Sequence, residues 1–238
     1  MDLPEKGAAM DKRHPCLSCE RQCLHQFVPD EELVRNVDFI EYDSGETIIK
    51  QGKKIQNRYV LCEGYVKVGS SNSKGKKAVF SLLSDPEIIE KSCLHSNRDH
   101  YPINAVAATD VTVSVIAVDE FQRMVKKHAG LSDYITEEIS RELDFQLQKA
   151  AMNSWAGSRE NLIWLLLSLY QKLDHGGKTN EPLDLHMSEN DLAGMLGVSR
   201  ETVVIHLSSL KKQGLARATR GSVIVTDYDG LVQLKDNM

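Results

Sequence analysis

The 238-residue sequence has no long apolar run, no signal-like amino terminus and only five cysteines. Its longest uninterrupted apolar run, residues 162–167, falls far short of the ~20 residues that a membrane-spanning helix needs. The opening MDLPEKGAAMDKRHP lacks the apolar core that a secretory signal requires. These absences predict a cytoplasmic protein with no membrane partner. Thiols stay reduced in the cytoplasm, which disfavours structural disulfides.

Signatures of catalysis are missing as well. The chain contains no Ser/His/Asp order of a hydrolase triad, no glycine-rich phosphate-binding loop and no dinucleotide-binding glycine motif. We therefore expect no enzymatic activity. The net charge of −5 gives no overall basic excess of the kind that marks many nucleic-acid-binding proteins, but a whole-chain sum can hide a local basic patch.

Residues 39–118 contain a series of short runs that alternate in polarity or are rich in β-branched residues. Turns rich in Gly, Asn and Ser, such as DSGE and SSNSKGKK, separate these runs. Several short strands at close spacing predict an antiparallel barrel or sandwich. The expected strands are residues 39–42, 47–49, 59–61, 65–68, 78–83, 103–107 and 111–118.

Beyond Glu120 the apolar period lengthens to four residues, which predicts an amphipathic helix that runs to about residue 153. Residues 154–158 (SWAGS) interrupt the pattern, and a second helix is expected over residues 160–173. A long helix with a narrow apolar stripe usually pairs with another helix, so we expect a homodimer, although the helix could instead pack on its own strands. The stripe begins at Leu131, and the predicted dimer contacts are Ile135, Ile139, Leu143 and Leu147.

Residues 188–214, SENDLAGMLGVSRETVVIHLSSLKKQG, predict two short helices joined by a tight turn. Ser188 with Asp191 three positions later forms a capping-box-like helix start. Gly197 ends the first helix, and Ser199 can cap a second, longer one. This arrangement is typical of a helix-turn-helix, whose second helix enters the major groove of DNA; an ordinary helical hairpin is the alternative.

The segment after Gly214, LARATRGSVIVTDYDGL, predicts a β-hairpin with Arg220 and Gly221 at its turn, in the place of a wing beside the second helix. Between Gly197 and Gly221 there are five basic residues against one acidic residue, a local charge of +4. A basic region at this place suits the phosphates of DNA, and it answers the objection raised by the overall negative charge.

The outward, N-terminal positions of the second helix should meet base edges, while the basic residues around it should bind phosphates. Arg200 can reach guanine or a phosphate, and Glu201 can accept a hydrogen bond from cytosine N4. An outward pair of Val204 and Ile205 can contact thymine methyl groups. The predicted DNA contacts are Ser199, Arg200, Glu201, Val204, Ile205, His206, Lys211, Lys212, Arg217 and Arg220.

These features resemble the CRP/FNR family of bacterial transcription regulators from about Phe39 to the carboxy terminus. SGETIIKQG is similar to that family's first roll turns, and LAGMLGVSRETV is similar to its helix-turn-helix. The resemblance implies an α+β fold with an N-terminal antiparallel β-roll of the cyclic-nucleotide-binding type, a long dimerisation helix and a C-terminal winged helix-turn-helix. It also implies double-stranded DNA with a near-palindromic operator, and RNA polymerase, as partners. The expected units are a cysteine-containing arm (1–30), a β-roll sensor domain (31–126), a dimerisation helix (127–154) and a DNA-binding domain (155–238).

Three of the five cysteines lie within the eight residues CLSCERQC. Clustered thiols in a reduced compartment favour metal binding or redox chemistry. The residues alone leave open an iron–sulfur cluster, a zinc site that adds a histidine, a thiol–disulfide switch, or chance. A CxxC oxidoreductase is a further alternative, although such enzymes place a strand before the motif and none is expected here. The cysteines are Cys16, Cys19 and Cys23, and the candidate histidines are His14, His25 and His95.

The segment DHYPINAVAAT resembles the FNR branch, the oxygen sensors, in which three amino-terminal cysteines and one roll cysteine hold a [4Fe–4S] cluster. The resemblance implies a cluster bound by Cys16, Cys19 and Cys23 that senses oxygen, nitric oxide or redox state. The family's fourth ligand position holds Ser114 here. The fourth thiolate is therefore expected from Cys93, with Cys62 as the alternative.

Two other effectors of the family are less expected. Members that bind cyclic AMP carry a Gly-Glu turn and an Arg-Ser pair, whereas here Glu90 lacks the glycines and Tyr101-Pro102 falls where the pair should be, so we expect no cyclic nucleotide. Heme-based carbon monoxide sensors carry a Cys-x-His in this region, so Cys93 and His95 are alternative heme ligands. Heme would leave the amino-terminal cysteines unexplained. Ile205 also replaces the family's usual second arginine, which points to an operator that differs from the family consensus.

Overall fold

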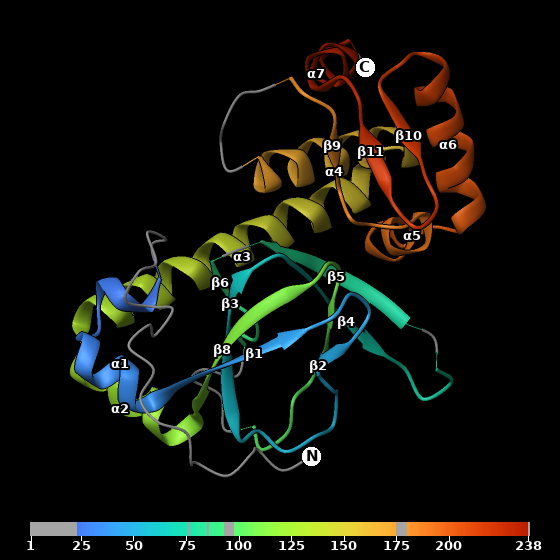
Figure 1. The fold of residues 1–238 in the computed structure, drawn as a ribbon. Helices are drawn as coiled ribbons and strands as arrows, with labels where there is room; N and C mark the ends of the chain where they lie inside the picture. The colour runs from blue at the N-terminus through green and yellow to red at the C-terminus, as the bar shows by residue number, and fades with distance from the viewer. Residues whose placement is uncertain (1–22, 76, 85, 93–97, 175–179, 238) are drawn as a thin grey trace.

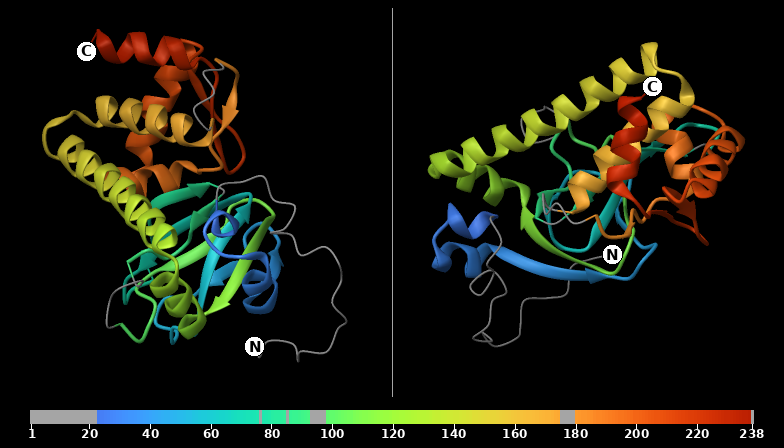
Figure 2. Two further views of the ribbon diagram at one scale, coloured as in Figure 1. Left: turned by 90° about the vertical axis from the view of Figure 1, so that its left-hand side faces the viewer. Right: turned by 90° about the horizontal axis from the view of Figure 1, so that it is seen from above.

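The structure is a computed structural model of the chain, and it describes residues 23–75, 77–84, 86–92, 98–174 and 180–237 (Figure 1). A β-domain forms the amino-terminal half and a mainly helical domain forms the carboxy-terminal half. Figure 2 shows the helical domain stacked on the β-domain, with the long helix α3 (Ala129–Trp155) running along one side. Among the described residues, no helix is long and apolar enough to cross a membrane.

Two four-stranded antiparallel sheets make up the β-domain. The first has the order β1 (Val37–Tyr42), β8 (Val111–Ala117), β3 (Asn57–Glu63) and β6 (Glu87–Ile88). The second has the order β2 (Thr47–Ile49), β7 (Asn104–Ala107), β4 (Tyr65–Ser71) and β5 (Lys77–Ser84). The seven predicted strands are confirmed, with ends that move by up to three residues. The two-residue strand β6 was not predicted, because a run that short has no detectable alternation.

Alternation along the strands gives each sheet an inner and an outer face. In β8, Val111, Val113 and Val115 lie in the core between the two sheets. Ser114 and Ile116 alternate with these valines and therefore lie on the outer face of the first sheet. That outer face is buried too, because a layer of helices covers it.

The covering layer consists of the short helix η2 (Leu24–Gln26), α1 (Asp30–Asn36), α2 (Val118–Lys127) and the start of α3. Leu24 and Leu33 from this layer pack with Leu131 of α3 over the outer face. Neither η2 nor α1 was predicted, since residues 1–30 read as an irregular arm. The chain directly after Cys23 is thus a packed part of the β-domain.

Helix α3 does not begin where the sequence pattern placed it. The predicted helix from Glu120 is split in two at His128, where α2 ends and α3 starts. The second half of the prediction is confirmed, since α3 ends at Trp155 within the SWAGS segment.

The apolar stripe along α3 faces two different surroundings. An α-helix turns by about 100° per residue, so residues four apart drift by about 40° per step. Ile135 is consequently buried in the chain's own core, while Leu143 and Leu147 are 55% and 59% exposed. Neighbouring residues of its own chain already cover Ile135, which leaves it little surface for a partner. The dimer contact stays a prediction for Ile135, for the half-buried Ile139, and for Leu143 and Leu147.

The carboxy-terminal domain is built around α4 (Ser158–Leu173), whose residues are buried on nearly all sides. Around it lie α5 (Glu189–Leu196), α6 (Arg200–Lys212), α7 (Tyr228–Asp236) and a three-stranded sheet. That sheet has the order β10 (Ala216–Ala218), β11 (Val223–Val225) and β9 (Leu183–Asp184). The predicted helix-turn-helix and wing hairpin are confirmed; α7 and β9 were not predicted.

The two domains contact one another directly through β4 and β5. The ammonium of Lys67 on β4 lies 2.8 Å from the carboxylate of Asp191 on α5. The ring of Tyr65 stacks on His186 with the ring centroids 4.7 Å apart. Leu82 of β5 belongs to the hydrophobic core of the carboxy-terminal domain. Apolar packing and a partly buried ion pair thus join the domains.

Candidate nucleic-acid interface and cysteine site

The two helices of the helix-turn-helix begin at side-chain caps. Ser188 and Asp191 form a complete capping box at the start of α5, as the sequence predicted. Ser199 accepts a hydrogen bond from the backbone amide of Thr202 at the start of α6. Between them Gly197 has a φ of 68°, a left-handed conformation that glycine adopts without strain. These local signals fix the angle at which α6 leaves α5.

The outward face of α6 carries one exposed apolar side chain among polar and charged ones. Ile205 is 67% exposed, and Val204 beside it is half-buried. Val203, Leu207 and Leu210 face inward and are buried. An exposed isoleucine on a capped helix cannot hydrogen-bond to base edges, but it can contact the methyl group of thymine.

Two charged residues at the start of α6 differ in their freedom to reach DNA. A guanidinium nitrogen of Arg200 donates to the carboxylate of Glu189 at 2.6 Å, so Arg200 is tied to the start of α5. Hydrogen bonds from its own backbone amide and from Ser199 lower the pKa of Glu201, so this exposed carboxylate is ionised. Glu201 is therefore available as an acceptor, while Arg200 must exchange partners to bind a base or a phosphate.

His206 points toward α4. Its Nε2 lies 2.8 Å from the hydroxyl of Ser158, the first residue of α4. Burial and the positive charge of Arg159 lower the pKa of His206, so the ring is neutral near pH 7. These contacts give His206 a structural partner, and its contact with DNA stays a prediction.

The predicted phosphate-binding residues surround the second helix. Lys211 and Lys212 are exposed in the last turn of α6. Arg217 is exposed on β10, and Arg220 is exposed beside Gly221 at the hairpin turn. All four charges are accessible to a phosphate backbone alongside α6.

Cys23 is the member of the amino-terminal trio that the structure describes. Its side chain is only 5% exposed, and its Sγ lies 3.6 Å from Nδ1 of His25. The ring of Phe27, four residues on, packs on Tyr134 of α3 with 5.3 Å between ring centroids. The described residues that follow Cys23 therefore pack against the first turns of α3, where a predicted sensor would have to act.

Cys62 lies near the end of β3, where the pairing with β8 shifts register between Leu61 and Glu63. Its Sγ lies 3.5 Å from the carbonyl oxygen of Val60. The side chain of Val60 packs on the outer face of the first sheet, which the layer after Cys23 covers. Ser114 pairs with Val60 in the neighbouring strand and shares that face. Its hydroxyl is buried and has no hydrogen-bond partner among the described residues.

The remaining predicted metal ligands lie outside the described residues: these are Cys16, Cys19 and Cys93, with the alternatives His14 and His95. Within the described ranges, no three His, Cys, Asp or Glu side chains converge as a metal site. Neither Cys23 nor Cys62 forms a disulfide among the described residues. The structure therefore describes two possible sulfur donors of the predicted set.

The region predicted not to bind a cyclic nucleotide has its polar groups engaged within the protein. The hydroxyl of Tyr101 donates to the backbone carbonyl of Asn57 at 2.6 Å. Glu90 is buried and accepts from the hydroxyl of Ser92 at 2.6 Å. Neither residue supplies the positive charge that a phosphate would require, and the absence of a cyclic nucleotide stays a prediction.

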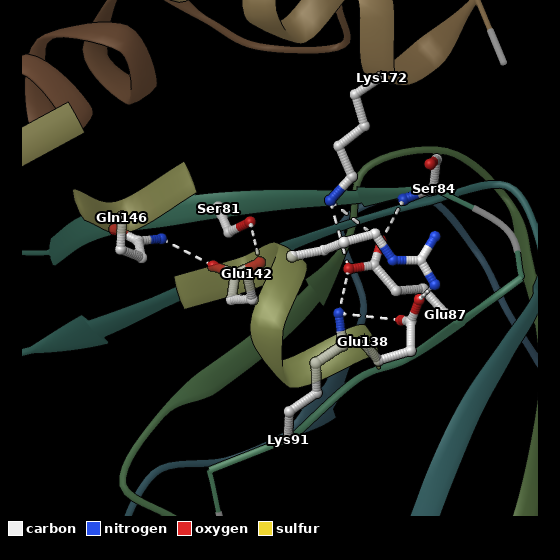
Figure 3. Close-up of polar contacts among 9 residues, drawn as sticks. Ser81, Ser84, Glu87, Lys91, Glu138, Glu142, Gln146 and Lys172 are labelled. Atoms are coloured by element: carbon white, nitrogen blue, oxygen red, sulfur yellow. Dashed lines mark hydrogen bonds and ion pairs between the residues drawn. The ribbon is translucent and has the colours of Figure 1, made fainter. Parts of the chain in front are cut away.

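A buried charge cluster, which we call the junction cluster, lies where the β-domain, α3 and α4 meet (Figure 3). Glu87 of β6 is its centre, and the ammonium groups of Lys91 and Lys172 converge on that carboxylate. Lys91 also lies 3.1 Å from Glu138 of α3, which pairs with Arg141. The junction cluster was missed from the sequence, because its charges come from separate segments.

Electrostatics keep the junction cluster ionised. Burial alone would raise the pKa of Glu87, but the charges of Lys172 and Lys91 outweigh it and hold that pKa below its ordinary value. Burial would lower the pKa of Lys91, and Glu87 and Glu138 raise it instead. Lys172 comes from the carboxy-terminal domain, so these charges join both domains to α3.

Two sequence families match the chain. Residues 39–128 match the cyclic nucleotide-binding domain, and residues 160–234 match the Crp-like helix-turn-helix domain. Among curated proteins, the chain is 26% identical over 204 residues to the transcriptional regulatory protein btr of Bordetella pertussis, covering 86% of this chain and 83% of btr. It is 24% identical to the transcriptional activator protein FnrL of Cereibacter sphaeroides, covering 81% and 78% of the two chains.

Solved structures show the same fold. FixK2 from Bradyrhizobium japonicum superposes with a TM-score of 0.69 at 17% identity, covering 83% of this chain and 96% of FixK2. A variant of CooA from Carboxydothermus hydrogenoformans superposes with a TM-score of 0.69 at 18% identity, covering 89% and 93% of the two chains. With its strand roll, long helix and winged helix-turn-helix in this order, the chain belongs to the CRP/FNR family of DNA-binding transcription regulators.

Proposed function

We propose that this regulator is a homodimer whose binding to a near-palindromic operator is controlled by an iron–sulfur cluster, most simply [4Fe–4S], held by Cys16, Cys19 and Cys23. The main supporting observation is the placement of Cys23. It is a buried thiol on a segment that packs directly on the start of α3. A change in the ligation of Cys23 would therefore act where the dimer helix begins.

The residues present fit such a cluster. Iron–sulfur clusters take thiolate ligands, and hydrogen bonds to their sulfurs tune them. Cys23 and Cys62 form no disulfide among the described residues, so both sulfurs are in the reduced form that a cluster needs. The buried, unpartnered hydroxyl of Ser114 lies on the face of the first sheet that the segment after Cys23 covers. We propose Cys62 or Cys93 as the fourth ligand.

The chain's own residues transmit the signal in this proposal. When bound, the cluster supplies oxygen- and nitric-oxide-sensitive iron chemistry. Ligated Cys23 holds the segment with Phe27 on Tyr134, which fixes the amino-terminal turns of α3. The exposed Leu143 and Leu147 further along α3 then pair with the second copy. Pairing sets two α6 helices about one DNA turn, ~34 Å, apart on the operator, where RNA polymerase is the expected partner.

Purification without oxygen tests this function. We expect a coloured protein with visible absorption and about four iron and four sulfide per chain. Exposure to air should bleach it and weaken operator binding, measured at fixed salt by fluorescence anisotropy. A zinc or heme protein would differ in metal analysis and spectrum. Colourless, metal-free protein with air-independent DNA binding would refute the sensing proposal and leave the family assignment intact.

The operator is expected to contain a thymine that Ile205 reads by its methyl group. Replacing that thymine with deoxyuridine removes only the methyl, and we expect binding to weaken about fourfold, in line with ~0.8 kcal/mol for one buried methylene-sized group. Scanning uracil through each operator position and measuring Kd at constant salt finds the position.

Ile205→Ala is the matched variant for this scan. It should bind the thymine operator more weakly and show no penalty for uracil at the position concerned, because the methyl contact is already gone. Ser208→Ala, exposed one turn on, is the control that should keep the wild-type uracil penalty. Equal uracil penalties in the wild type and Ile205→Ala would contradict the contact.

A further inference from the structure

A groove with several lysines lies between the outer face of the second sheet and α5, and we call it the basic groove. Its volume is about 670 Å³, within the ~300–1,000 Å³ that small-molecule sites occupy, and such sites are common where two domains meet. Strands β2, β7, β4 and β5 supply the floor, and α5 supplies one wall. The charged residues that line the basic groove are Lys50, Lys67, Lys77 and Asp191.

The pairing of the strands leaves the floor of the basic groove open. Lys67 of β4 pairs with Val106 of β7, Gly69 of β4 pairs with Asn104 of β7, and all four line the groove. A Cβ on residue 69 would lie 2.2 Å from the carbonyl oxygen of Ala78 on β5, so a larger residue would force the two strands apart. Because glycine is required here, no side chain at position 69 fills the space beside Lys67.

Positive charge exceeds negative charge in the basic groove. Three ammonium groups line it against one carboxylate, a local excess of +2 in a chain whose net charge is −5. The Lys67 ammonium lies 2.8 Å from Asp191. Lys50 and Lys77 are exposed, and neither forms an ion pair with another described residue. Charges of one sign gathered around a hollow raise the local concentration of ligands of the opposite sign.

The uncharged lining of the basic groove also suits an anion. Thr47 and Ser70 carry hydroxyl groups that can donate hydrogen bonds, and Val79 and Val106 add a small apolar surface. Hydrogen bonds from ammonium groups to phosphate oxygens are among the stronger ones in proteins, and lysine binds phosphate as a point charge. The arrangement therefore fits a compact ligand that carries more than one negative charge.

We propose that the basic groove binds a small molecule bearing a phosphate or pyrophosphate group, which contacts Lys50, Lys67 and Lys77. The site is separate from the cysteines, and this inference does not rest on the iron–sulfur proposal. Since Asp191 caps α5, an anion that competes with Asp191 for Lys67 acts directly on the contact between the β-domain and the helix-turn-helix.

Calorimetric titration of the full chain with inorganic pyrophosphate, at constant ionic strength and without divalent cations, tests the site. We expect saturable binding of one pyrophosphate per chain. Replacing Lys50 and Lys77 together with alanine should weaken it at least tenfold, because one charge at ~4 Å in a solvated site contributes about fivefold. Asp191→Asn should bind pyrophosphate about fivefold more tightly, since it removes a repelling charge and frees Lys67.

Replacing Lys53 and Lys126 together with alanine is the matched control. Both are exposed and neither lines the basic groove, so the same loss of charge should change the affinity by less than about twofold. Absence of saturable binding to the wild type overturns the inference. Equal weakening in the two double variants overturns it as well, because the attraction would then be diffuse.

Two further outcomes would also contradict the site. An Asp191→Asn variant that binds pyrophosphate no more tightly than the wild type would place the anion away from α5. The phosphates of DNA are the other source of the same chemistry, and a longer operator duplex distinguishes them. If the double variant of Lys50 and Lys77 keeps wild-type pyrophosphate affinity and loses affinity only for the longer duplex, the groove binds DNA and the inference fails.

Discussion

Replacing Cys16, Cys19 and Cys23 together with serine is expected to reduce iron from about four per chain to below one, since a serine hydroxyl is a poor substitute for a soft thiolate. Without oxygen, the variant should bind the operator at least tenfold more weakly than the loaded wild type, which is about 1.4 kcal/mol. Its affinity should match that of the air-exposed wild type. Iron analysis and anisotropy titrations under nitrogen measure both effects.

Single substitutions assign the fourth ligand in the same assay. Cys62→Ser and Cys93→Ser should differ sharply, because only the ligand's loss should reduce iron content and the visible absorption. Cys62 lies at a register shift near the end of β3, and Cys93 lies outside the described residues, so the iron content of the two variants decides between them. A triple variant that keeps wild-type iron and the wild-type response to air would disprove cluster binding by the amino-terminal cysteines.

Replacing Lys91 with methionine is expected to lower the free energy of unfolding by about 1–3 kcal/mol at pH 7. The substitution removes the cation that Glu87 and Glu138 share and leaves Glu87 only with Lys172 and Glu138 only with Arg141. The buried negative charge is then only partly compensated, which is costly. Urea unfolding followed by circular dichroism measures the loss. Lys126→Met is the control; Lys126 is exposed on α2, and its loss should change stability by less than 0.5 kcal/mol, on the order of other surface substitutions.

The destabilisation by Lys91→Met should shrink in acid. The pKa of Glu87 is lowered in the folded wild type, so its contribution to stability is present above the ordinary value of 4.5 and is lost as pH falls through the folded pKa. In the variant Glu87 has lost one of its two cations and therefore protonates at higher pH, which relieves the partly compensated negative charge. A stability difference that stays constant from pH 7 to pH 4 would show that the ion pair is not its cause.

The helix-turn-helix was predictable in detail because its determinants are local. Ser188, Asp191, Gly197 and Ser199 specify two helix starts and one turn within twelve residues, and each takes the predicted role. The strands were predictable for the same reason, since alternation between glycine turns is visible in a short window. The fold class followed from these elements and from their resemblance to a family.

Features that depend on distant residues were not predictable. The junction cluster joins Glu87, Lys91, Glu138 and Lys172, and nothing in the sequence pairs them. The burial of Ile135 depends on what covers α3, so a period of four could not divide the stripe into a buried and an exposed part. The unpartnered hydroxyl of Ser114 likewise shows itself only when the surrounding atoms are in place.

The contact between β4–β5 and the carboxy-terminal domain limits how freely the two halves can be recombined. Leu82 of β5 is part of the hydrophobic core of the carboxy-terminal domain. Lys67 of β4 forms an ion pair with Asp191, which caps the start of α5. A chimera that fuses this carboxy-terminal domain to the β-domain of another regulator would leave a cavity where Leu82 packs and would leave Asp191 without its ion-pair partner Lys67. The β-domain and the carboxy-terminal domain of this regulator therefore cannot be exchanged independently. A working chimera must also carry the residues that form the contact between them, such as Lys67 and Leu82.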